Sequence, residues 1–158
     1  MGKVKKHFNY EPYIKSLAEF ISKYYKVKPY PQIKISNRNQ GDDEVFIKTG
    51  YYDPQTKTIM LFSRGRHPKD VLRSCAHEFL HHYQNLESRL GTDAYSGDRI
   101  VDDDKLIELE KEAYLKGNIV FRQWTETMQK QIESEPTKHM RKLIRIDEET
   151  FNKLITLS

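Results

Sequence analysis

Residues 75–84, with the sequence CAHEFLHHYQ, hold three histidines, and two of them have a spacing that suits metal binding. His77 and His81 stand four residues apart, so on a helix they lie on one face about one turn from each other. Two neutral imidazole nitrogens at that spacing can bind one Zn²⁺ and leave it a positively charged Lewis acid. His82 points about 100° away round such a helix, so we expect a structural or supporting role for it.

Glu78 directly follows the first of these histidines and completes the pattern His-Glu-x-x-His. The helix of a zinc metallopeptidase carries this pattern, with the glutamate as general base. Zinc brings the pKa of its bound water toward 7, so a neighbouring carboxylate can take the proton and hand it to a leaving amine. The pattern therefore predicts zinc-dependent peptide hydrolysis with Glu78 as the proton carrier. The alternative is the polar flank of an ordinary helix.

A catalytic zinc needs a third protein ligand and an open position, and that ligand is a histidine or a carboxylate. No histidine lies between His82 and His139, but the segment ELEKEAY offers Glu108, Glu110 and Glu112. By helical phase Glu110 falls within an apolar stripe, Glu112 lies toward its edge and Glu108 points nearly opposite. A glutamate in such a stripe is costly without a partner, and zinc would be one. The stripe comprises Leu106, Leu109, Ala113, Gly117, Val120 and Trp124.

Three short strands are expected ahead of the histidine helix, at residues 32–36, 44–53 and 58–62. The segment DPQTK between the second and third strands is typical of a hairpin turn, with Pro54 at its first central position. Residues 12–27 have a helical apolar period and predict a helix before the strands. The strand just before the histidine helix is expected to pair with an extended substrate.

Two longer helices follow the expected strands. Pro68 and Asp70 suit the first turn of a helix that runs to about residue 87. After a loop over residues 88–101, the acidic triplet 102–104 begins a long helix that ends near residue 133. The segment DEETFNKLITL is expected to form a capped terminal helix.

The segment HEFLH, followed about 30 residues later by EKEA, resembles the gluzincin metallopeptidases. These include thermolysin-like enzymes, the ImmA/IrrE family and small phage and bacterial proteins with the same histidine pattern. In them a glutamate begins the pattern Glu-x-x-small residue on a second helix. The resemblance covers roughly residues 45–124. It implies that Glu110 is the third ligand of one Zn²⁺ per chain and that Ala113 is the small residue.

One position departs from the gluzincin pattern. Many gluzincins carry Asp or Asn directly after the small residue, where it supports a zinc-binding histidine, and this chain has Tyr114 there. Support for His77 or His81 must then come from elsewhere, such as a backbone carbonyl or the tyrosine hydroxyl. Tyr95, Tyr114 and His139 are the candidate donors to the oxyanion that forms during hydrolysis.

Length and composition favour one α+β domain over residues 1–158, a minimal zincin-like unit. We expect a small, three-stranded, mostly antiparallel sheet packed on the histidine helix and a long second helix. The single cysteine excludes an internal disulfide, and Cys75, on an apolar helix face, is expected to be buried and inert. The chain has no apolar run of about 20 residues and no secretory signal, so we expect a cytoplasmic protein.

Two functions from different classes follow from these observations. The first is a phage or bacterial zinc metalloendopeptidase that acts on a protein or peptide. The second is a non-enzymatic basic module that binds nucleic acid or protein and keeps a structural or vestigial zinc site. A net charge of +4 permits a nucleic-acid partner without requiring one. SprT-like proteases, which act on DNA-bound proteins, use a third histidine that this chain lacks at a suitable spacing.

Overall fold

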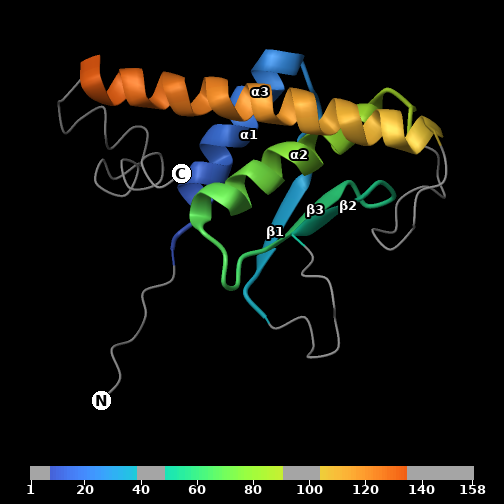
Figure 1. Ribbon diagram of the computed structural model, residues 1–158, viewed down its shortest axis with the longest axis horizontal. Coiled ribbons are helices and arrows are strands. Elements are labelled where there is room, and N and C mark those ends of the chain that lie inside the picture. Colours follow the sequence, from blue (N-terminus) through green and yellow to red (C-terminus); the bar gives the residue numbers. More distant parts are fainter. Residues whose placement is uncertain (1–7, 39–48, 91–103, 135–158) are drawn as a thin grey trace.

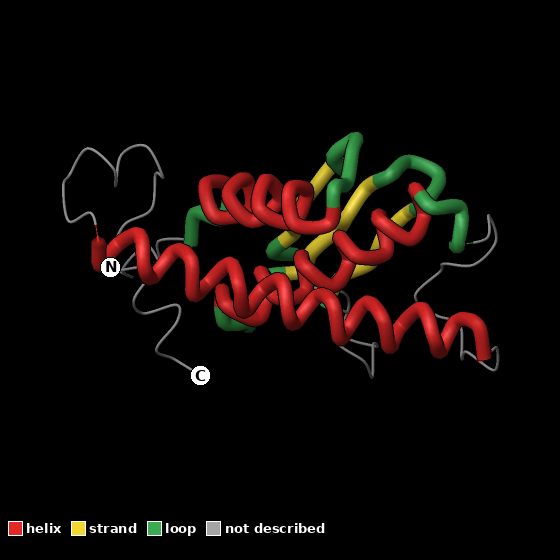
Figure 2. Tube along the Cα trace, turned by 90° about the horizontal axis from the view of Figure 1, so that it is seen from above, coloured by secondary structure: helices red, strands yellow, loops and turns green. Residues whose placement is uncertain are grey.

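The computed structural model describes residues 8–38, 49–90 and 104–134. These residues form three helices and a three-stranded sheet, which confirms the predicted α+β class. In chain order the elements are α1 (Glu11–Tyr25), β1 (Gln32–Ser36), β2 (Gly50–Asp53), β3 (Thr58–Phe62), α2 (Pro68–Leu86) and α3 (Asp104–Ser134). In Figure 1, α2 lies between the long α3 and the sheet. Figure 2 shows α1 and α2 side by side against α3.

The sheet has the strand order β1-β3-β2 and is mixed. β2 runs antiparallel to β3, with Tyr52 opposite Ile59, whereas β1 runs parallel to β3, with Ile33 opposite Ile59. The prediction of a mostly antiparallel sheet is therefore wrong for one of the two strand pairs. A tight turn makes β2 and β3 antiparallel, but nothing local in the sequence shows which edge of β3 receives β1.

The central place of β3 also corrects the expectation about substrate pairing. β3 is the strand that directly precedes the histidine helix, and both of its edges are hydrogen-bonded to neighbouring strands. It has no backbone donors and acceptors left for an extended peptide. Within the described part of the chain, only the outer edges of β1 and β2 are open to such pairing.

The turn between β2 and β3 confirms the predicted hairpin. The Asp53 carboxylate accepts a hydrogen bond from the backbone N–H of Gln55 at 2.9 Å, and Lys57 takes a left-handed φ of 53°. The predicted bounds of β1 and β3 agree with the structure, whereas the structure begins β2 at Gly50. Three predictions lie wholly or mostly outside the described residues: the first part of the second strand (residues 44–48), most of the loop over residues 88–101, and the terminal helix.

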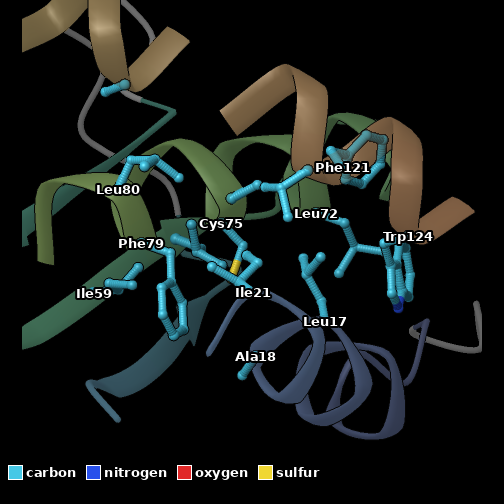
Figure 3. Packing of buried hydrophobic residues seen from close by; sticks show 14 of the residues in the cluster. Leu17, Ala18, Ile21, Ile59, Leu72, Cys75, Phe79, Leu80, Phe121 and Trp124 are labelled. Atoms are coloured by element: carbon cyan, nitrogen blue, oxygen red, sulfur yellow. The ribbon is translucent and has the colours of Figure 1, made fainter. Parts of the chain in front are cut away.

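The apolar core fills the space between α1, the sheet and the facing sides of α2 and α3 (Figure 3). Trp124 of α3 is almost fully buried, and its indole N–H donates to the Ser16 hydroxyl of α1 at 3.1 Å. This bond connects the C-terminal half of α3 to α1, and α3 also packs across α2. None of the helices in the described ranges has the length and hydrophobicity needed to cross a membrane.

Cys75 should not react with thiol reagents in the folded protein. Its side chain is fully buried, and burial, together with the nearby charge of Glu78, raises the thiol pKa to about 12. Because only the thiolate is nucleophilic, Ellman's reagent at about pH 8 should label no thiol in the native protein. The same reagent should label the single cysteine after unfolding in guanidinium chloride. Rapid labelling of the native protein would contradict the burial of this side chain.

Candidate metal centre

Helix α2 carries both histidines of the pair on the face that meets α3. The helix starts at a capped position, where the His67 imidazole accepts a hydrogen bond from the backbone N–H of Lys69 at 3.1 Å. About three turns further on, the Nε2 atoms of His77 and His81 lie 3.2 Å apart. The two imidazoles therefore present the same ring nitrogen to one point in space, as a shared metal ion requires.

Glu110 of α3 completes this cluster. Its carboxylate oxygens lie 3.2 Å from His77 Nε2 and 3.1 Å from His81 Nε2. The ligand atoms of a tetrahedral zinc site, at bond lengths of about 2.0–2.1 Å, are separated by about 3.3 Å. The three groups thus have the spacing and the chemistry of a zinc site with three protein ligands and an open position, and they form a group that could hold a metal ion.

The other two candidate glutamates are engaged away from the histidines. Both carboxylate oxygens of Glu112 accept hydrogen bonds from the Arg89 guanidinium at 2.7 Å. Glu108 is largely exposed and lies 3.8 Å from the Lys111 ammonium. Of the three, only Glu110 lies beside the histidine pair, as its place in the apolar stripe predicted.

Small residues of α3 let the two helices approach closely at this point. A Cβ atom at Gly117 would lie only 3.2 Å from His77 Cα, so the backbone of α3 passes directly over the first histidine. Ala113, the predicted small residue, is fully buried one turn before Gly117. Larger side chains at these positions would push α3 away and take Glu110 out of reach of the imidazoles.

Glu78 is a buried carboxyl group beside the cluster. Its side chain is 5% exposed, and its Oε2 has no hydrogen-bond partner among the described residues. Burial raises the pKa of Glu78, although the nearby charges of His81 and His77 act in the opposite direction. A carboxyl group with a raised pKa takes up and returns a proton near neutral pH more readily than an ordinary glutamate.

The cluster is electrostatically self-consistent without an ion. Burial alone would raise the pKa of Glu110, but hydrogen bonds and charges from His77 and His81 lower it to about 2. Burial alone would lower the pKa of His81, yet the hydrogen bond and charge of Glu110, together with Glu78, raise it overall. Because the pKa of His81 is raised, protons compete with a metal ion for this imidazole, so metal binding should weaken as pH falls.

Gln84 is the supporting residue that sequence reasoning missed. It is fully buried, and its side-chain oxygen lies 2.9 Å from His81 Nδ1. The only local signal is its position three residues after His81, on the same helix face. A glutamine at that spacing has many possible partners, so the signal is weak until the fold is known.

Tyr114 contacts the first histidine through its ring. The ring centroids of Tyr114 and His77 are 4.3 Å apart, and the tyrosine side chain is 62% exposed. His77 Nδ1 is buried and has no hydrogen-bond partner among the described residues, so neither a backbone carbonyl nor the tyrosine hydroxyl, the two kinds of support considered, bonds to this atom there. Tyr95 and His139, the other candidate oxyanion donors, lie outside the described residues.

His82 is a structural histidine, as its direction on the helix indicated. Its Nε2 lies 2.7 Å from the Pro29 carbonyl, which can only accept, so Nε2 carries the proton. Its Nδ1 then accepts from the Tyr52 hydroxyl at 2.7 Å, and that hydroxyl accepts from the Asn85 amide at 3.0 Å. Burial lowers the pKa of His82, which favours this neutral form. The network joins α2 to β2 and to the turn before β1.

Replacing His82 with Phe should destabilise the fold without removing the metal site. The buried Tyr52 hydroxyl would lose its acceptor, at about 1–3 kcal/mol for an unsatisfied buried group, and the carbonyl of the exposed Pro29 would lose its donor. Urea unfolding of the metal-free protein measures this loss, and Tyr52→Phe should show a smaller loss from the same network. Zinc affinity of the folded variant should stay close to that of the wild type. A variant of unchanged stability would contradict the structural role.

Comparison of the chain with protein-family models, with curated proteins and with solved structures found no match. We therefore infer the function from the geometry of the cluster and the chemistry of its residues.

Proposed function

We propose that this protein is a zinc-dependent metallopeptidase that hydrolyses peptide bonds in a protein or peptide substrate. The observation that carries the proposal is the meeting of His77, His81 and Glu110 from two helices, with donor atoms 3.1 to 3.2 Å apart. A purely structural ion pair would not need two histidine nitrogens and a carboxylate at one point. Nor would it need a second carboxyl group, Glu78, buried beside them with an oxygen unpaired.

Each protein group in the cluster has a task in such a reaction. When bound, zinc supplies a Lewis acid that polarises the substrate carbonyl and lowers the pKa of a water toward 7. Glu78 takes a proton from the attacking water and passes it to the leaving amine. Burial of Glu78 suits both steps, because it raises the pKa of the carboxyl group that must hold the proton between them.

Metal content and turnover test this function together. Protein purified without added metal should contain about one zinc per chain by mass spectrometry, as expected for two imidazoles and a carboxylate. It should cleave an unfolded protein such as casein, lose this activity with a chelator and regain it with added zinc. Zinc without cleavage would instead favour the non-enzymatic module with a structural site. A protein that binds no zinc would contradict the metal centre itself.

A further inference from the structure

We infer that Gln84 is a positioning residue that holds His81 in its metal-binding tautomer, and that Glu112 and Arg89 in turn orient Gln84. The inference rests on the proposed metal site, since it concerns how one of its ligands is prepared. Hydrogen bonds connect the four residues in the order Arg89, Glu112, Gln84 and His81, and His81 belongs to the metal cluster.

The hydrogen-bond directions follow from the partners of Gln84. Its side-chain nitrogen donates to the Leu109 carbonyl at 2.9 Å, and a carbonyl can only accept. The amide therefore cannot be flipped, and its oxygen must be the atom that faces His81 Nδ1 at 2.9 Å. That oxygen only accepts, so His81 Nδ1 carries a proton. Nε2 is then the nitrogen left for the metal, and it is the atom that faces Glu110.

A second acceptor holds the Gln84 amide in this orientation. The Gln84 side-chain nitrogen also lies 3.3 Å from Glu112 Oε1. The Arg89 guanidinium holds Glu112 in place through bidentate hydrogen bonds of 2.7 Å. This bidentate pairing with a guanidinium favours the charged form of Glu112, which can only accept hydrogen bonds. Arg89 follows the end of α2, where its backbone N–H donates to the Gln84 carbonyl at 2.9 Å. Arg89 and Gln84 are thus joined directly through the backbone and indirectly, through Glu112, by their side chains.

This arrangement makes the two histidines unequal. His81 is fully buried and has a fixed partner for its second nitrogen, whereas His77 Nδ1 has none among the described residues and the His77 ring packs on Tyr114. Supporting hydrogen bonds of this kind set the tautomer and basicity of metal-binding histidines. His81 is then the preorganised ligand of the pair.

Two substitutions of Gln84 separate hydrogen bonding from packing. Gln84→Met keeps the approximate volume but removes the acceptor, and it should weaken zinc binding by about 10–100-fold in competition with a chelator. Gln84→Glu keeps an oxygen acceptor for His81 Nδ1 and should retain most of the affinity, although it loses the bonds of the amide nitrogen to the Leu109 carbonyl and to Glu112. Nitrogen NMR shifts of metal-free His81, recorded at alkaline pH, should show one tautomer in the wild type and Gln84→Glu. They should show a mixture in Gln84→Met.

A pair of glutamate variants on α3 provides the matched control and covers the case that Gln84→Met does not fold. Glu112→Gln loses the charge that Arg89 pairs with and should weaken zinc binding, but less than Gln84→Met. Glu126→Gln breaks the exposed ion pair with Arg122 on the same helix and should change nothing. Unchanged zinc affinity and tautomer in both Gln84→Met and Glu112→Gln would overturn the inference. If wild-type protein binds no zinc, the metal site fails, and the tautomer measurement still decides the role of Gln84.

Discussion

Glu78→Gln is expected to keep zinc bound and to lower the rate of peptide hydrolysis by about 10²–10⁴-fold, the usual contribution of a general acid–base group. Glutamine has nearly the same shape as glutamate, so the buried position beside the histidines stays filled. The amide cannot take a proton from water, so only the chemical step suffers. Turnover of a fluorogenic peptide and zinc content per chain, measured on the same preparation, test this expectation.

Glu78→Gln should also change the stability of the fold, and this effect can be measured independently of activity. Burial raises the pKa of Glu78 in the folded protein, so its charge destabilises the metal-free fold above the ordinary pKa of the side chain, about 4.3. Glu78→Gln should therefore be more stable than the wild type to urea at neutral pH. The difference should disappear as pH falls below that ordinary value, where glutamate is protonated in both states. Loss of zinc in Glu78→Gln, or full activity, would contradict the assigned role.

Glu110→Ala is expected to abolish tight zinc binding, because it removes one of the three ligands. The decrease in zinc affinity should exceed the roughly 10–100-fold decrease that follows when a residue supporting a ligand is removed. The substitution should also lower the pKa of His81 relative to the wild type, since the hydrogen bond with Glu110 is the largest of the effects that raise it. Competition with a chelator gives the affinity, and the histidine proton signals give the titration.

Glu108→Ala is the matched control for this experiment. Glu108 lies two residues earlier on α3, is exposed and forms an ion pair with Lys111 at 3.8 Å. Zinc affinity and peptide hydrolysis should both stay at the wild-type level. If Glu110→Ala binds zinc as tightly as Glu108→Ala does, the third ligand is another group.

Much of the local structure follows from short-range signals. The helical period predicts α1, the first-turn residues Pro68 and Asp70 predict the start of α2, and the DPQTK segment predicts the hairpin. These features depend on neighbours within one turn or one pair of strands. The separate direction of His82 also follows from its position on the helix.

Tertiary packing decided the rest, because the partners come from distant elements. The strand order depends on how α1 packs, because α1 directly precedes β1 and sets its position in the sheet. The central place of β3 follows from that order. The role of Gln84 depends on the Leu109 carbonyl and on Glu112, both on α3, and no pattern within α2 indicates them.

The histidine pair and Glu110 show which features of the metal centre the sequence predicts and which depend on the fold. The spacing of His77, Glu78 and His81 was sufficient by itself to predict a metal-binding helix face, since one turn of helix brings the imidazoles together. Helical phase also singled out Glu110 among its neighbours. Only the fold could bring that carboxylate to both Nε2 atoms, because the approach requires α3 to cross α2 at Gly117 with no side chain between their backbones.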